Sequence, residues 1–175
     1  PAALTTLPSI TDKPNGDDVP KMAVLLGAWD PIELVLAKMG LKATITKDLL
    51  GRAQVLAKDA PSFAIYGIHF PGEMTPYPSA VKLLTDATEI SKYHIVFIPC
   101  SGSVNMGGDP NAPQCSGVFN FDARVKTNLN DFVKKGGRVY ASDWSYEYVR
   151  QVFPGFVSWR GETATIGSAC SVSKS

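Results

Sequence analysis

The sequence has few of the residues that carry nucleophilic or metal chemistry. Among its 175 residues are only two histidines and three cysteines. No cysteine pair has CxxC spacing and no histidine pair has HxxxH spacing, the arrangements typical of zinc sites. The phosphate-binding motif GxxxxGK[ST] and the dinucleotide-binding motif GxGxxG are also missing. We therefore expect no metal and no cofactor, although a flavin site would be compatible with the topology inferred below.

Charge of one sign is not concentrated anywhere in the chain. Seventeen basic residues face sixteen acidic ones, for a formal net charge of +1. A nucleic-acid-binding domain normally carries a basic patch or stripe, and a peripheral membrane anchor carries a polybasic segment. No apolar run approaches the roughly 20 residues that span a bilayer. We expect neither a nucleic-acid partner nor a membrane span.

The length suits one domain with a buried core. Residues 1–20 are rich in Pro, Thr, Asp and Gly without periodicity, and we interpret them as a flexible N-terminal arm. Residues 21–170 form the predicted α/β domain, and residues 171–175 form a frayed end. The chain begins at Pro1, which fits either removal of a secretory signal or a cloning boundary.

The odd number of cysteines leaves at least one of them unpaired within the chain. Cys100 and Cys115 flank a loop rich in Gly, Pro, Asn and Ser, and a disulfide bond could close that loop. The alternative is that both are reduced thiols, with Cys170 as a third. A disulfide would place the protein in the periplasm, at the cell surface or in the secreted fraction. Together with the non-Met start and the polar arm, this possible disulfide leads us to expect an exported protein, and a cytoplasmic protein is the alternative.

Strand and helix patterns alternate along the chain. Residues 21–27 form a continuous apolar run that ends in glycine, which is typical of a strand buried on both faces. Asp30, Pro31 and Glu33 then form a capping box for a helix that ends at Gly40. Residues 41–46 alternate like a second strand. This βαβ unit predicts that the two strands are parallel.

The rest of the chain continues the alternation. We predict a short helix within 48–60, strands at 63–70, 93–99 and 138–142, helices at 79–90, 121–135 and from 143 onward, and short terminal strands at 156–159 and 163–166. The predicted fold is an α/β three-layer sandwich with a mostly parallel, flavodoxin-like central sheet.

A candidate site follows from this topology. Ligands of open α/β sheets bind outside the carboxyl ends of the strands, where the strand order reverses. The segments that leave the three clearest strands supply the candidate binding residues, which are Trp29, Asp30, Cys100, Ser101, Gly102, Asp143 and Trp144. Each type also has a structural explanation: the aspartates can cap helices, the tryptophans can cover the sheet edge, and the cysteine can be a small buried apolar residue.

The order of segments in the second half resembles the class I glutamine amidotransferase-like superfamily, including its ThuA-like members. A strand HIVFIP, a small-residue loop, a helix ending in KKGG, a strand RVYAS, a sharp turn and a helix follow one another, and the resemblance covers 21–153. The resemblance implies a cysteine nucleophile at the turn after RVYAS and oxyanion-binding N–H groups in the loop after HIVFIP. Here Asp143 holds the nucleophile position, and Cys100 begins the other loop.

The histidines argue against the family's Cys–His–Glu triad. His94 starts the strand that Cys100 follows, and six residues at ~3.3 Å each separate them by about 20 Å. His69 could approach, but nothing in its spacing requires it. We therefore predict no catalytic residues and a domain that binds a small ligand, a glycan or a protein partner. The alternative is a hydrolase or transferase of altered chemistry that uses Asp143, or Cys100 with His69.

Overall fold

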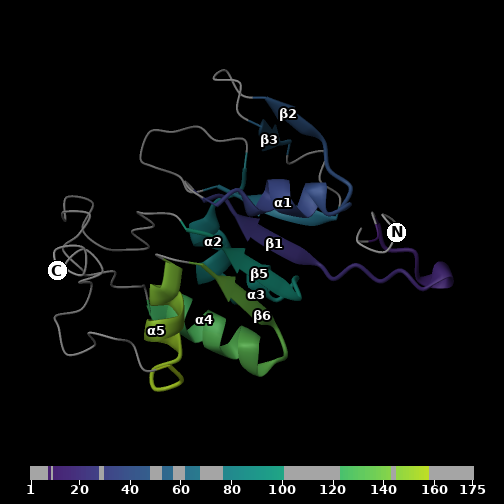
Figure 1. The fold of residues 1–175 in the computed structure, drawn as a ribbon. Helices are drawn as coiled ribbons and strands as arrows, with labels where there is room; N and C mark the ends of the chain where they lie inside the picture. Colours follow the sequence, from purple (N-terminus) through teal and green to yellow (C-terminus); the bar gives the residue numbers. More distant parts are fainter. Residues whose placement is uncertain are drawn as a thin grey trace.

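The computed structural model describes residues 8, 10–27, 30–47, 53–56, 62–67, 77–100, 123–142 and 145–157. Its centre is a four-stranded sheet in the order β4-β1-β5-β6 (Figure 1). The strands are β1 (Met22–Leu25), β4 (Phe63–Tyr66), β5 (Ile95–Ile98) and β6 (Arg138–Ala141). All three neighbouring pairs are parallel, which confirms the predicted α/β class.

Helices cover both faces of this sheet. They are α1 (Ile32–Lys38), α2 (Ala80–Thr85), α3 (Ala87–Ile90), α4 (Ala123–Lys134) and α5 (Tyr146–Val152). One core cluster joins the sheet to α2, α3, α4 and α5, and a second joins the opposite face to α1 and to β3 (Ala53–Val55). The chain therefore forms three layers, as predicted.

The residues of β1 show how the layers divide. Ala23 and Leu25 belong to the first cluster, whereas Met22 and Val24 belong to the second. Successive side chains of a strand point to opposite faces, and all four of these are buried. A strand with helices on both faces needs an apolar run without alternation, which is the pattern that the sequence has at this position.

A strand predicted at 41–46 is confirmed only at Ile45 and Thr46, and the prediction that it lies parallel to the first strand was wrong. β2 (Ile45–Lys47) pairs antiparallel with β3 in a separate two-stranded sheet, and β4 takes the place beside β1. The physical reason lies in the polar alternation: Ile45 and Lys47 are exposed, and a central parallel strand would have to bury both faces. The short helix predicted within 48–60 was also wrong over residues 53–55, which form β3.

The single helix predicted at 79–90 is two helices. Asp86 is extended (φ −107°, ψ 109°), and its carboxylate accepts hydrogen bonds from the N–H groups of Thr88 (2.9 Å) and Glu89 (3.2 Å). Aspartate is a strong N-cap residue, so it starts α3 immediately after α2 ends.

The strands at β5 and β6 and the long helix α4 confirm the predictions for this half of the chain. Val125, Leu129 and Phe132 are buried, as their spacing predicts. Beyond α4, the N–H of Gly136 donates to Val133 O and that of Gly137 to Phe132 O. With Gly136 at φ +94°, these bonds form a Schellman motif, which explains why the helix ends here.

Two predictions at the ends of the chain have mixed outcomes. Within the predicted flexible arm, residues 12–17 form a turn in which Asp12 and Asp17 exchange both backbone hydrogen bonds (2.8 and 3.0 Å). Phe156 and Val157 form no strand, against the prediction for 156–159, and the strand predicted at 163–166 lies outside the described residues.

Within the described ranges, every helix falls short of the length and apolar character that a bilayer span requires.

Candidate functional site at the carboxyl edge of the sheet

The strand order defines where the sheet has its topological switch point. The chain leaves β1 toward β4 on one side, and it leaves β5 toward β6 on the other side. The loops after β1 and β5 therefore diverge between these two neighbouring strands. This is the position at which open α/β sheets form a crevice for ligands.

The ends of β1 and β5 approach each other closely at this point. A Cβ atom on Gly27 would lie 2.8 Å from Pro99 Cγ and 2.9 Å from the backbone oxygen of Cys100. Real Cβ contacts are essentially never shorter than 3.0 Å, so only glycine fits at this position. The absence of a side chain allows the two strand ends to pack backbone against backbone.

Four residues from three strand ends then join in one hydrogen-bonded group, which we call the strand-end cluster: Asp30, Cys100, Ser142 and Ser145. Ser142 Oγ donates to Asp30 Oδ2 (2.6 Å). The N–H of Cys100 lies 3.0 Å from Ser142 Oγ and 3.3 Å from Asp30 Oδ2, and donates to both. One carboxylate oxygen thus connects the segments that follow β1, β5 and β6.

Ser145 joins the cluster from the start of α5. Its side chain is buried, and its Oγ donates to the backbone oxygen of Pro99 (2.6 Å). Its N–H donates to Ser142 O (3.0 Å). The turn after β6 is therefore held against the end of β5 by a side chain and by its own backbone.

Asp30 does not cap a helix, so the predicted capping box is wrong. The N-cap of α1 is Pro31, and it has no side-chain capping bond. The Asp30 carboxylate turns instead to Ser142 and Cys100, because two donors from the neighbouring strand ends reach it there. A distant tertiary contact has replaced the local one that the sequence favours.

Glu33, the other member of the predicted box, is buried in the first turn of α1. Its side chain is 7% exposed, and among the described residues its Oε2 has no hydrogen-bond partner. Burial raises the pKa of this carboxyl above its ordinary value, with a smaller opposing effect of its own backbone N–H. Burial, followed by the nearby Glu33 charge, also raises the pKa of Tyr77.

The other predicted binding residues are neighbours of the cluster residues in the sequence. Trp29, Ser101, Gly102, Asp143 and Trp144 lie outside the described residues. Cys115 does too, so the Cys100–Cys115 disulfide stays a prediction. The described residues contain no disulfide bond, and the Cys100 side chain is only 3% exposed.

The two histidines have different outcomes. His94 lies at the amino edge of the sheet. Its ring Nδ1 accepts from the backbone N–H of Lys21 (3.0 Å), and its backbone N–H donates to Lys21 O (2.7 Å). His94 therefore precedes β5 while Cys100 follows it, as the spacing predicts. His69 lies outside the described residues. In the described part of the chain, the strand-end cluster has no imidazole partner.

Sequence reasoning missed Ser142 and gave Ser145 no role. Their signal was weak, because a serine at the end of a strand is common, and Asp30 is 112 residues away from Ser142 in the chain. The described ranges also contain no group of three or more metal-ligating side chains.

Comparisons with known proteins give no relative for this chain. No family model, no curated protein and no solved structure matches it. The fold and the strand-end cluster therefore define the class of protein. It is an α/β sandwich whose strand ends are joined by hydrogen bonds at the switch point.

Proposed function

We propose that this chain is a ligand- or partner-binding domain whose site is the carboxyl edge of the sheet around the strand-end cluster. The observation that carries the proposal is the convergence of Asp30, Cys100 and Ser142 at the switch point. Hydrogen bonds between these residues fix the starts of the three segments that leave the sheet. A binding site gains affinity when its contacts are held in place before the ligand arrives.

The chemistry of the cluster favours binding over catalysis. Ser142 Oγ donates directly to a carboxylate, and a carboxylate is far too weak a base to deprotonate a serine hydroxyl. Nucleophilic serines and cysteines need a base such as an imidazole within hydrogen-bond reach. The N–H of Cys100 and the hydroxyl of Ser142 already donate to Asp30, and the hydroxyl of Ser145 donates to Pro99 O. The cluster therefore acts as a scaffold for the adjoining segments.

The amidotransferase-like scaffold is part of the proposal. Its support is the order of β5, α4, the Gly136–Gly137 motif, β6, a turn and α5, which follows the order expected from the resemblance. In this interpretation the domain keeps the scaffold and uses it to bind a small molecule, a glycan or a protein partner.

A binding experiment with Asp30→Asn tests the proposal. Asparagine keeps an oxygen that can accept from Ser142 and Cys100, so we expect the fold to survive while the negative charge is lost. The protein would be screened against monosaccharides, disaccharides and short peptides of either charge. We expect the best ligand of the screen to bind Asp30→Asn at least fivefold more weakly than the parent protein. A loss of this size corresponds to about one charge-assisted hydrogen bond.

Asp131→Asn is the matched control, because Asp131 is an exposed carboxylate on α4. Equal loss of binding in the two variants, or none in Asp30→Asn, would contradict the proposed site. Turnover of any ligand in the screen would contradict the non-catalytic role.

The alternative, an enzyme that uses Cys100, is tested by thiol chemistry. The side chain is 3% exposed, so we expect iodoacetamide to modify Cys100 at least tenfold more slowly in the native protein than in denaturant. Mass spectrometry without reduction would show in the same samples whether Cys100 and Cys115 form a disulfide, which would support export. Fast alkylation of native Cys100 would restore the enzyme hypothesis.

A further inference from the structure

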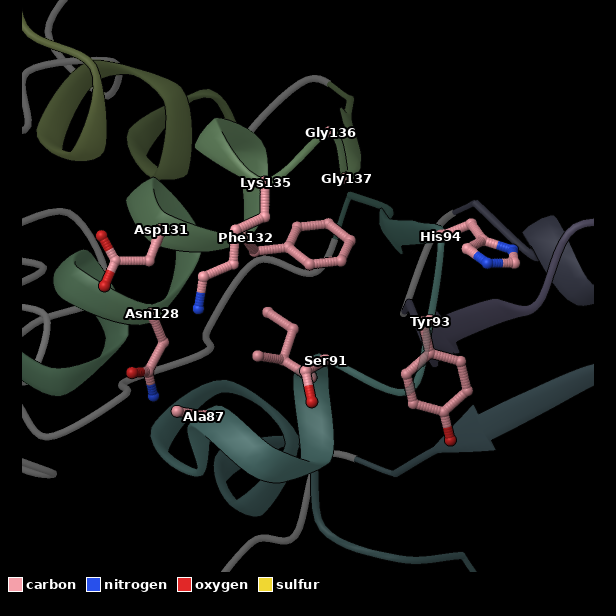
Figure 2. A pocket seen from close by; sticks show the side chains of 11 residues that line it. Ala87, Ser91, Tyr93, His94, Asn128, Asp131, Phe132, Lys135, Gly136 and Gly137 are labelled. Atoms are coloured by element: carbon pink, nitrogen blue, oxygen red, sulfur yellow. The ribbon is translucent and has the colours of Figure 1, made fainter.

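The amino edge of the sheet, opposite the strand-end cluster, has a cavity of about 250 Å³. It opens between α3 and α4, beside the starts of β5 and β6 (Figure 2). Its apolar part is formed by Ile90, Phe132 and Tyr93, of which the first two are buried. The Schellman motif at Gly136 and Gly137 forms another part of the wall.

Gly137 explains the shape of this wall. A Cβ atom on Gly137 would lie 2.5 Å from the Phe132 ring, so the ring packs where any other residue would have its side chain. The N–H groups of Gly136 and Gly137 are both used within the motif. The wall is therefore fixed by the helix end and presents mostly carbon to the cavity.

The polar groups at the cavity differ in what they can offer a ligand. Asn128 Nδ2 donates to Leu84 O (3.0 Å) and Ser91 Oγ donates to Thr88 O (2.8 Å). The Lys135 side chain makes no ion pair or hydrogen bond within the described residues. In Figure 2 it extends along α4 toward Asn128, whereas the Asp131 carboxylate points outward.

The surroundings add positive charge. Lys21 and Arg138 lie at the starts of β1 and β6, and Lys92 lies in the turn that leads into β5. Of the nearby acids, Glu89 is bound by Lys92 and by the hydroxyl of Tyr66. The net field at this edge attracts an anion.

From this geometry we propose a second binding site, at the amino edge, for a small carboxylate with an apolar body. An apolar cavity of ~150 Å³ holds a benzene ring, and drug-sized pockets begin near 300 Å³. The present cavity lies between these sizes and accommodates one ring with a carboxylate. The ring contacts Ile90 and Phe132, and the carboxylate accepts from the Lys135 ammonium group.

The probe is benzoate, titrated into the ¹⁵N-labelled protein while amide shifts are followed by NMR. We expect saturable shifts centred on Ala87, Gly136 and Gly137. Benzamide, which has the same ring without the charge, should bind about fivefold more weakly, the upper range for an exposed ion pair. Lys135→Met keeps the apolar stem and should weaken benzoate binding by about the same factor, while leaving benzamide unaffected.

Two further variants make the result decisive. Lys134→Met changes the neighbouring lysine, which does not line the cavity, and should leave benzoate binding unchanged. Ala87→Trp fills the mouth from an exposed position and should remove binding of both probes. Absence of saturable shifts at the cavity in the folded protein, or equal benzoate affinity in Lys135→Met and Lys134→Met, would overturn the proposal.

Discussion

The two edges of the central sheet are held together in different ways. At the carboxyl edge, side chains from distant parts of the sequence are bonded to one another, as Asp30 is to Ser142. At the amino edge, the bonds that close the structure are mainly local or involve the backbone, as in the Gly136–Gly137 motif and the pairing of Lys21 with His94. We therefore expect side chains at the amino edge to tolerate substitution better. Those at the carboxyl edge hold three segments together at once.

Gly27→Ala should give the largest effect, because it places a methyl group against the backbone of Cys100. Overpacking a tight contact costs about 1–3 kcal/mol, and we expect the upper end since backbone atoms cannot move aside easily. Denaturant unfolding would measure the loss. At the amino edge, Gly136→Ala has open space around its Cβ and only the strain of φ +94°, about 1 kcal/mol. A larger loss in Gly136→Ala would reverse the comparison of the edges.

Asp30→Ala should cost about 2 kcal/mol, because the hydroxyl of Ser142 loses its acceptor and the N–H of Cys100 keeps only Ser142 Oγ. Asp131→Ala, which removes an exposed carboxylate on α4, should change the free energy of unfolding by less than about 0.5 kcal/mol. Equal destabilisation of the two variants would show that the Asp30 carboxylate contributes no more to stability than an exposed carboxylate does.

Two carboxyl groups, one near each edge, should give opposite dependences on pH. Burial raises the pKa of Glu33, so its stabilising contribution is complete below about pH 4.5 and is lost as the pH rises through the folded-state pKa. Hydrogen bonds from Lys92 and then Tyr66 lower the pKa of Glu89, so its contribution is present above pH 4.5 and is lost as the pH falls.

The matched variants are Glu33→Gln and Glu89→Gln, compared by thermal unfolding between pH 4 and pH 7. Relative to the parent protein, Glu33→Gln should gain stability as the pH rises, and Glu89→Gln should lose it. The same slope in both variants would mean that the Glu33 carboxyl is solvated or paired in solution.

Much of the central fold could be predicted from the sequence, because each buried strand is a local signal. The apolar runs that became β1 and β5 need burial on both faces wherever they lie. The placement of β2 and β3 could not be predicted in this way, since a three-residue strand with polar alternation leaves the choice of partner to tertiary packing.

The candidate site shows the same limit. The rule for strand ends predicted that the segments holding Asp30 and Cys100 would meet, and the structure brings these residues within hydrogen-bond distance. The role of the Asp30 side chain could not be inferred, because a cap three residues before Glu33 is a strong local signal while the competing donor on Ser142 is far away in the chain. The cavity at the amino edge depends on packing between α3 and α4, which has no local signal.

The most direct test of the binding role is NMR mapping of the best ligand from the saccharide and peptide screen on the ¹⁵N-labelled protein. The account predicts saturable shifts at the amides of Asp30, Cys100, Ser142 and Ser145, which weaken in Asp30→Asn and persist in Asp131→Asn. Shifts that map only to the amino edge, or to neither edge, would contradict the assignment of the carboxyl edge as the binding site.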